Sequence, residues 1–192
     1  MSVAVEPASP LGLTRKRWLI LLGLATVALN VALAVIDKRL EATGGPSILG
    51  LEFAGSAERV AEIEAEWGAH GGDLARLSLW LDFPFMLSYG AFFALAGVAT
   101  RDFASAHGLR ALGACGMVAP FLAIVAAGFD AAENVSWLLL LGGHGASWLA
   151  PFATACAVVK FVAIVLVIGY VVWGLVSRLR LRRRSRGQPE AD

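Results

Sequence analysis

The sequence predicts an all-α, polytopic membrane protein: a four-helix bundle with a short amphipathic helix in its first outer loop. Of the 192 residues, 58% are hydrophobic and only 16% are charged, whereas about 25% are charged in an average soluble domain. Four long stretches are continuously apolar rather than alternating between apolar and polar residues. This pattern indicates membrane-spanning helices and not membrane strands.

The four expected spans are long enough to cross a bilayer core, which takes about 20 helical residues. They cover residues 18–36, 77–100, 111–141 and 151–177. The third is longer than one crossing requires, which predicts a tilt, a kink near Pro120 or an extension past the outer surface. Together the spans form one transmembrane domain over residues 18–177, between an N-terminal segment 1–17 and a basic tail 178–192.

Charges beside the spans predict which end of each span faces the cytoplasm. Basic residues precede the first span, stand between the second and third, and follow the fourth: Arg15, Lys16, Arg17, Arg101, Arg110, Arg178, Arg180, Arg182, Arg183, Arg184 and Arg186. The connection 37–76 instead carries eight acids and four bases. The positive-inside rule therefore places both termini in the cytoplasm and residues 37–76 outside, in the cell inner (plasma) membrane.

The first span has an alternative interpretation as a cleaved secretory signal. A basic start, an apolar run and the small residues of Ala32-Leu33-Ala34 are typical of such a signal. A retained span is favoured, because the core of a signal peptide is usually shorter than a membrane crossing.

The acidic outer loop predicts one amphipathic helix. Ser56 is a suitable N-cap for a helix over residues 57–67, and Gly71-Gly72 is expected to end it. The apolar face of this helix comprises Val60, Ile63 and Trp67. We expect the helix to lie on the outer membrane surface or to cover the end of the bundle. A gate or a partner-docking helix is the alternative interpretation.

Charged residues inside the spans are functional candidates, because each costs on the order of 2.5–3.5 kcal/mol to insert. Four charged and four polar residues form this set: Asp82, Asp130, Glu133, Lys160, Asn30, Ser78, Tyr89 and Asn134. Asp130, Glu133 and Asn134 stand at i, i+3 and i+4, so they share one helix face. Ser78, Asp82 and Tyr89 likewise form one stripe of the second span.

Depth predicts that these residues meet in the outer half of the bundle. At 1.5 Å per residue, Asp82 lies ~8 Å, Lys160 ~14 Å and Asn30 ~9 Å from the outer ends of their spans. Three carboxylates would then face one ammonium group, and a low-dielectric site cannot hold them all ionised without compensation. A proton, water or a cationic ligand is expected to compensate. The alternative is a structural cluster in which Lys160 pairs with Asp82 or Glu133.

Neither a metal site nor a cofactor is expected. His70, His107 and His144 fall in connections without metal-ligand spacing, although a ligand role for His144 is an alternative to a flexible turn. The bilayer is the expected partner, with the basic tail near anionic lipid. Nucleic acid is not an expected partner.

Short motifs resemble those of a group of small four-span bacterial membrane proteins to which no activity is assigned. That group has D-x-x-F-x-x-x-Y-G and D-x-x-E-N patterns and an outer helix of the form G-S-x-E-R … W-G. The matching segments here are residues 82–90 (DFPFMLSYG), 130–134 (DAAEN), 55–59 (GSAER) and 67–68 (WG). The resemblance spans about residues 50–140. It implies that Asp82, Tyr89, Asp130, Glu133 and Asn134 form one constellation, without naming a substrate.

The favoured hypothesis is that the carboxylate-rich site binds a small amphiphilic or cationic ligand. One alternative is a membrane enzyme, in which Asp130 or Glu133 protonates a lipid or isoprenoid between Tyr89 and Trp137. Another is a proton- or cation-coupled carrier, acting as a homo-oligomer because four helices make a thin pathway. A further alternative is an accessory subunit of a larger membrane complex. The sequence leaves open whether the protein is an enzyme.

Overall fold

The computed structural model describes residues 14–186, and within that range every regular element is a helix. The elements are α1 (Arg15–Glu41), α2 (Ile48–Glu52), α3 (Ala57–Ala106), α4 (Arg110–Ala114), the 3-10 turn η1 (Cys115–Met117), α5 (Val118–Leu141) and α6 (Leu149–Arg186). The prediction of an all-α protein is confirmed. Most of the expected N-terminal segment 1–17 and the end of the tail 178–192 lie outside the described residues.

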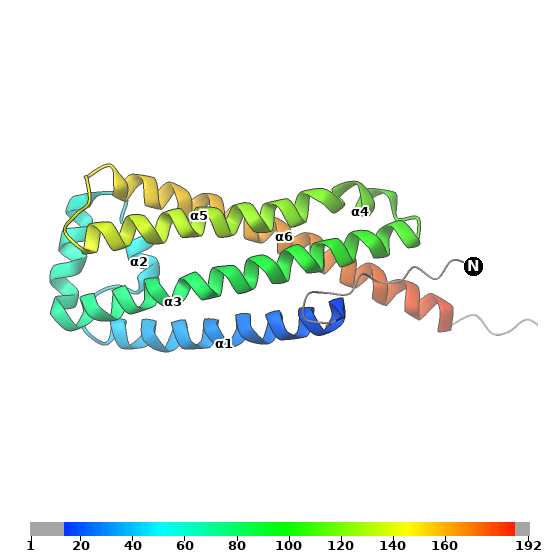
Figure 1. The fold of residues 1–192 in the computed structure, drawn as a ribbon, viewed down its shortest axis with the longest axis horizontal. Coiled ribbons are helices and arrows are strands. Elements are labelled where there is room, and N and C mark those ends of the chain that lie inside the picture. The colour runs from blue at the N-terminus through cyan, green and yellow to red at the C-terminus, as the bar shows by residue number, and fades with distance from the viewer. Residues whose placement is uncertain (1–13, 187–192) are drawn as a thin grey trace, which may run out of the picture.

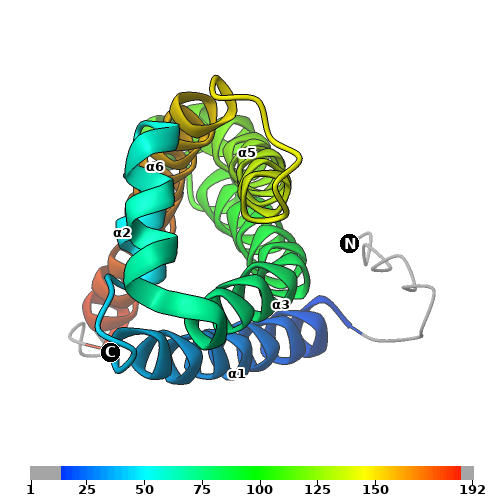
Figure 2. The same cartoon turned by 90° about the vertical axis from the view of Figure 1, so that its left-hand side faces the viewer.

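The four long helices run back and forth along the long axis of the molecule (Figure 1). We call the end that carries α2 and the start of α3 the loop end, and the end where α1 begins and α6 ends the terminal end. Seen from the loop end, α3, α5 and α6 surround a common interior, whereas α1 lies along the outer side of α3 (Figure 2). The closest packing joins α5 with α6 and α3 with α5, and α1 packs almost entirely on α3.

The outward faces of the long helices are apolar, as expected of surfaces in contact with lipid. Leu24 on α1, Phe121 on α5 and Val165 on α6 are 63%, 64% and 66% exposed. Monomeric soluble proteins rarely show so much contiguous apolar surface. Among residues 14–186, four helices are long and apolar enough to cross a membrane, and these observations together indicate a multi-pass membrane protein.

The first part of α3, residues 57–67, is a separate helical segment that we call the lid helix. Ser56 caps it as predicted, because its Oγ accepts a hydrogen bond from the Arg59 backbone N–H at 3.2 Å. The chain then turns at Gly68, whose φ of 62° and ψ of −171° are not helical. A positive φ of this kind favours glycine, so Gly68 sets the angle between the lid helix and the rest of α3.

The prediction that Gly71-Gly72 ends this helix was wrong, because both glycines are buried inside α3. Their small size serves close packing instead of a helix stop. A Cβ on Gly71 would come within 2.6 Å of the Trp67 Cβ and 3.0 Å of the Thr43 hydroxyl. The turn after the lid helix therefore has to occur before this contact, at Gly68.

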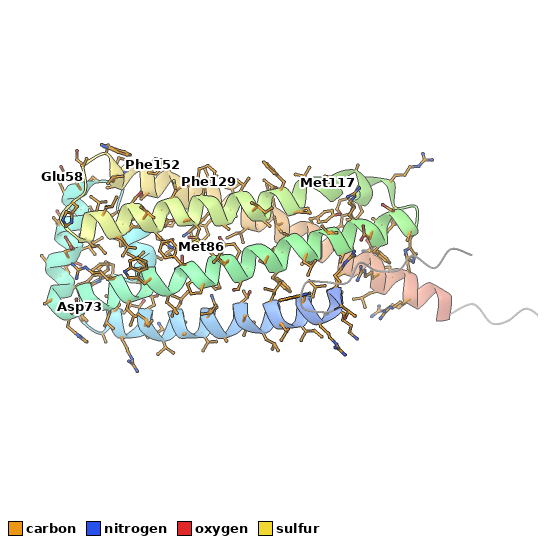
Figure 3. All side chains as sticks on the ribbon, viewed as in Figure 1. Glu58, Asp73, Met86, Met117, Phe129 and Phe152 are labelled. Atoms are coloured by element: carbon orange, nitrogen blue, oxygen red, sulfur yellow. The ribbon has the colours of Figure 1, made fainter. Side chains whose placement is uncertain are left out.

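Three apolar layers fill the interior along its length. The loop-end core joins the lid helix to the ends of the long helices through Leu40, Leu51, Val60, Ile63, Trp67, Ala75, Leu79, Trp137, Leu141, Ala150 and Ala153. A middle layer is built around Met86, Tyr89, Ala126 and Ala163, and a smaller layer near the terminal end around Ala104, Leu112, Ala119 and Tyr170. Figure 3 labels Met86 in the middle of α3, with Glu58 and Asp73 at the loop end. The lid helix thus covers the end of the bundle, which is one of the two positions expected from the sequence.

The long third apolar stretch is divided into α4, η1 and α5 rather than forming one helix. The break lies at Cys115–Met117, just before the Pro120 kink position considered from the sequence. Pro120 falls in the first turn of α5, where its missing N–H costs no helical hydrogen bond. The segment expected to be over-long therefore becomes a helix of ordinary crossing length, Val118–Leu141, after a short connecting helix.

Candidate functional site

Polar side chains from four helices meet between the loop-end core and the middle apolar layer. We call this cluster the polar centre. Its members are Glu52 from α2, Asp82 and Tyr89 from α3, Asp130, Glu133 and Asn134 from α5, and Lys160 from α6. The structure therefore brings together six of the eight charged and polar residues that the sequence singled out. Asn30 is not a member, and Ser78 is buried in α3 outside this set of contacts. The structure adds Glu52, which the sequence analysis missed.

Lys160 lies at the middle of the polar centre. Its Nζ lies 2.9 Å from Asp130 Oδ1, 2.8 Å from Glu133 Oε2 and 3.1 Å from Glu52 Oε1. The contact with Glu133 has the distance of an ion pair but not the direction of a hydrogen bond. An ammonium group has three N–H bonds. Two of them serve hydrogen bonds to Glu52 and Asp130, and Glu133 adds an ion-pair contact.

The hydrogen-bond network continues beyond Lys160 through the second oxygen of Asp130. Asp130 Oδ2 accepts a hydrogen bond from the Tyr89 hydroxyl at 2.8 Å. Asp82 Oδ2 accepts one from Asn134 Nδ2 at 2.6 Å, and the Asp82 carboxyl also interacts with Asp130. The shared faces predicted from helical spacing thus gather their polar groups into one cluster, with a bonded chain from Lys160 through Asp130 to Tyr89 and a separate bond between Asn134 and Asp82.

Trp137, which the enzyme hypothesis places as a wall opposite Tyr89, does not line an open pocket. Trp137 is fully buried in the loop-end core, with its Nε1 3.4 Å from Glu133 Oε1. Trp80 is exposed on α3 and packs against Phe83 at a ring distance of 5.5 Å. Trp137 therefore closes the polar centre on the side of the loop end, and Trp80 takes no part in it.

Glu52 reaches the polar centre because α2 is fastened at both of its ends. At the start of α2, the Ile48 backbone N–H donates a hydrogen bond to Asp37 Oδ1 at 2.7 Å. At its end, Thr154 Oγ1 on α6 donates to the Glu52 carbonyl oxygen at 2.8 Å and accepts from the Gly55 N–H at 3.2 Å. Burial raises the pKa of the Glu52 carboxyl, and the Lys160 ammonium partly opposes this shift. Its place in an otherwise apolar run was the sequence signal for this residue.

The prediction that Asn30 joins the site was wrong, because Asn30 is exposed on α1. α1 packs on α3, and its partly or fully buried residues include Thr26, Leu29, Leu33, Ile36 and Leu40. A helix turns by about 100° per residue, so Asn30 lies to one side of the line that these residues form. The position of Asn30 along its span was compatible with the site, but its rotation was not.

The polar centre has a large formal excess of negative charge. Three carboxyl groups, from Glu52, Asp130 and Glu133, contact the Lys160 ammonium, and the fourth carboxyl of the centre, Asp82, is bonded to Asn134 instead. The Lys160, Asp130 and Glu133 side chains are 6%, 4% and 0% exposed, and Glu52 is 13% exposed. Desolvation and like-charge repulsion prevent all four carboxyls from being ionised together. The centre must therefore hold protons, or bind further positive charge, to persist.

No protein-family model, no curated protein and no solved structure matches this chain. The resemblance of residues 82–90 and 130–134 to four-span bacterial membrane proteins therefore stays a prediction. The function of the polar centre has to be inferred from its own chemistry.

Proposed function

We propose that this chain is a proton-coupled membrane carrier that binds and releases protons at the polar centre. The observation that carries the proposal is the ratio of four carboxyls to one ammonium in a buried site. Lys160 neutralises at most one carboxylate, so up to three protons balance the remaining charge. Intramembrane carboxyl groups of this kind are typical of proton relays in pumps and transporters.

The packing around the polar centre favours a proton over a larger ligand. Trp137 and the rest of the loop-end core fill one side, and the layer around Met86 and Ala126 fills the other. A proton needs no cavity, because it moves along hydrogen bonds. In this closed state a larger ligand would have to displace α2 or the lid helix.

Glu52 is the carboxyl through which we expect protons to enter. It is the most exposed of the three acids that contact Lys160, and its Oε2 has no hydrogen-bond partner among the described residues. From Glu52 the network leads through Lys160 to Asp130 and then to Tyr89 in the middle layer. With both termini in the cytoplasm, this route opens toward the outside of the cell.

Infrared spectroscopy of the purified protein tests proton binding directly. A protonated carboxyl in a dry site gives a C=O stretching band at neutral pH, and a carboxylate does not. We expect this band in the wild type and a weaker band in Glu133→Gln. Glu58→Gln is the matched control, because Glu58 is an exposed acid of the same loop end. A wild-type spectrum without such a band at neutral pH would contradict the proposal.

Transport is tested in liposomes that contain the purified protein and an internal pH indicator. After an imposed pH step, we expect the wild type to change the internal pH faster than Asp82→Asn. Asp73→Asn is the control, because Asp73 is an aspartate of the same helix with a side chain that is 79% exposed. Equal rates in the two variants would remove the carrier proposal while leaving proton binding to the infrared result.

A small cationic amphiphile is a second candidate ligand, supported by an aromatic surface beside Glu52. Phe53 and Phe161 stack with ring centroids 6.0 Å apart and an interplanar angle of 14°, and both remain exposed. The Glu52 Oε2 is buried and has no hydrogen-bond partner among the described residues. A small movement of α2 would let an ammonium head group reach this oxygen while its apolar chain lies on the two rings. This arrangement keeps the ligand class that the sequence favoured, at the edge of the polar centre rather than within it.

Binding of a fluorescent primary alkylamine tests this second candidate. We expect weaker binding in Glu52→Gln and in Phe161→Leu than in the wild type. Glu58→Gln and Phe152→Leu remove the same side chains from the loop end without touching this surface, so they should bind like the wild type. Equal binding by all five proteins would exclude the site.

A further inference from the structure

A second charged site lies at the terminal end, far from the polar centre. A hollow of about 530 Å³ separates the last turns of α3 from the end of α6. Its lining comprises Phe103, His107, Arg178, Leu181 and Arg182. The hollow thus combines two guanidinium groups and an imidazole with apolar side chains.

Arg178 is held in place by contacts that leave its charge directed at this hollow. Its NH2 donates to the Ala99 carbonyl oxygen at 2.9 Å, and its guanidinium carbon lies 4.6 Å from the centre of the Phe103 ring. A guanidinium fixed on an aromatic face loses little further freedom when it binds a ligand.

His107 completes the same wall of the hollow. Its ring lies 4.3 Å from the Phe103 ring, and its Nδ1 is 2.9 Å from the Phe103 carbonyl oxygen. The side chains of Arg178, Phe103 and His107 are therefore ordered together.

The neighbouring acid does not neutralise this site. Asp102 is adjacent to Phe103 in sequence, but its Oδ2 forms an ion pair with Arg15 on α1 at 2.6 Å. No acid is among the residues that line the hollow. Within residues 14–186, Arg178 contacts a carbonyl oxygen and an aromatic ring, neither of which neutralises its charge. Guanidinium groups recognise phosphate through paired N–H donors.

The position of the hollow along α6 points to the source of the phosphate. Arg178 follows directly on the apolar run 151–177, so it lies where a membrane-spanning helix leaves the hydrocarbon core. Lipid phosphates occupy this level of a bilayer. Exposed Val176 and Leu179 flank Arg178 and provide apolar surface for acyl chains.

We propose that this hollow binds the phosphate group of an anionic membrane lipid, with Arg178 and Arg182 as its principal contacts. The site is independent of proton binding at the polar centre, because the two lie at opposite ends of the molecule. It is more specific than attraction of a basic tail to a charged surface, because defined side chains from two helices form it.

Native mass spectrometry after release from nanodiscs tests this proposal. The nanodiscs contain equal amounts of phosphatidylglycerol and phosphatidylcholine. We expect the wild type to retain phosphatidylglycerol preferentially and Arg182→Gln to retain it about fivefold more weakly, as expected for the loss of one basic contact. Arg182→Gln leaves the contacts of Arg178 with Ala99 and Phe103 in place. The Arg178→Gln/Arg182→Gln double variant should lose most of the preference.

The control is Arg180→Gln/Arg183→Gln, which removes two exposed charges of the same helix outside the hollow. It should retain the lipid within about twofold of the wild type. Equal loss in the two double variants would reduce the site to general surface attraction. Displacement of the lipid by excess inorganic phosphate would identify a free anion as the ligand. Equal retention of phosphatidylcholine would show that the hollow does not select lipids with a net negative charge, which would contradict the proposal.

Discussion

The two ends of the molecule handle charge in opposite ways. At the loop end, carboxyl groups are buried around Lys160 and covered by the lid helix. At the terminal end, Arg178 and Arg182 line an open hollow. Buried charge must be balanced by the protein itself, so the loop end is closed and internally connected. Charge at the surface can be balanced by lipid or solvent, so the terminal end remains open.

α6 makes the comparison within one helix, because it carries both Lys160 and Arg178. The lysine is a compact ammonium that forms ion pairs with three carboxylates. The arginine is a flat group that lies against an aromatic ring and binds a carbonyl oxygen. These residues are not interchangeable, and the difference in their surroundings separates the proposed proton site from the proposed phosphate site.

Removal of the buried cation should cause the largest loss of stability. Lys160→Met leaves the surrounding carboxyls without a counter-charge, and breaking a buried ion pair in this way costs about 3–5 kcal/mol. Denaturant unfolding in detergent micelles, followed by circular dichroism, measures this loss. Adding Asp130→Asn and Glu133→Gln to the same chain should recover much of it.

The matched change at the terminal end is Arg178→Met, which removes a partly exposed cation. We expect it to cost about 1 kcal/mol, because solvent and lipid replace the lost contacts. The contrast between the ends fails if Arg178→Met destabilises the protein as much as Lys160→Met does.

Loss of a buried aliphatic side chain should lower stability by a similar amount at the two ends. Only the loss at the loop end should also make the buried carboxyls more accessible to a reagent. Ile63→Ala in the loop-end core and Leu112→Ala near the terminal end should each cost about 2–5 kcal/mol, since both residues are almost fully buried. Only Ile63 belongs to the lid helix. Labelling by an apolar carbodiimide, which attacks protonated carboxyls, should therefore accelerate at Glu52 or Glu133 in Ile63→Ala alone. Comparable acceleration in Leu112→Ala would show that the lid helix does not control access.

The pH dependence of stability should have opposite signs at Glu52 and Glu58. Burial raises the pKa of Glu52 above its ordinary 4.5, so above this pH the folded chain keeps a proton that the unfolded chain has lost. Stability then falls as pH rises through the window between the two pKa values. Glu52→Gln should remove this fall in unfolding measurements made across a pH series.

Glu58 provides the comparison, because hydrogen bonds from its own backbone N–H and from Ser56 lower its pKa. Its contribution is present above the ordinary carboxyl pKa and is lost as pH falls through the lowered value. Glu58→Gln should therefore weaken the loss of stability at acid pH, by less than the effect at Glu52 because Glu58 is exposed to solvent. The same sign for both variants would contradict the difference in burial.

Most of the polar centre could be predicted from the sequence, because helical spacing and depth are local properties. Asp130, Glu133 and Asn134 share a face by their spacing alone, and the cost of charge in a membrane directs that face inward. The partners of each side chain could not be predicted in this way. They depend on how α3, α5 and α6 rotate against one another, which is decided by packing.

Glu52 and Asn30 show where local reasoning ends. Glu52 belongs to a five-residue helix whose position depends on Asp37 and on Thr154, about a hundred residues away in the chain. Asn30 has a suitable depth, but α1 packs on α3 through a line of residues that leaves it at the side. The prediction that Gly71-Gly72 ends the lid helix was wrong for a related reason. Glycine is favoured both by close packing and by helix ends, and the sequence alone does not distinguish the two.

The smallest effect is expected for Asn30→Ala, and Asn134→Ala provides the comparison. Both asparagines were candidates from the sequence. Asn30→Ala removes an exposed side chain, so it should change stability by less than about 0.5 kcal/mol and leave the infrared carboxyl band unaltered. Asn134→Ala removes the donor to Asp82 inside the polar centre, so it should cost about 1–3 kcal/mol and shift that band. A shift of the band by Asn30→Ala would place α1 in contact with the centre and make all four long helices part of the proton site. No shift by either variant would mean that Asp82 takes no part in holding the protons.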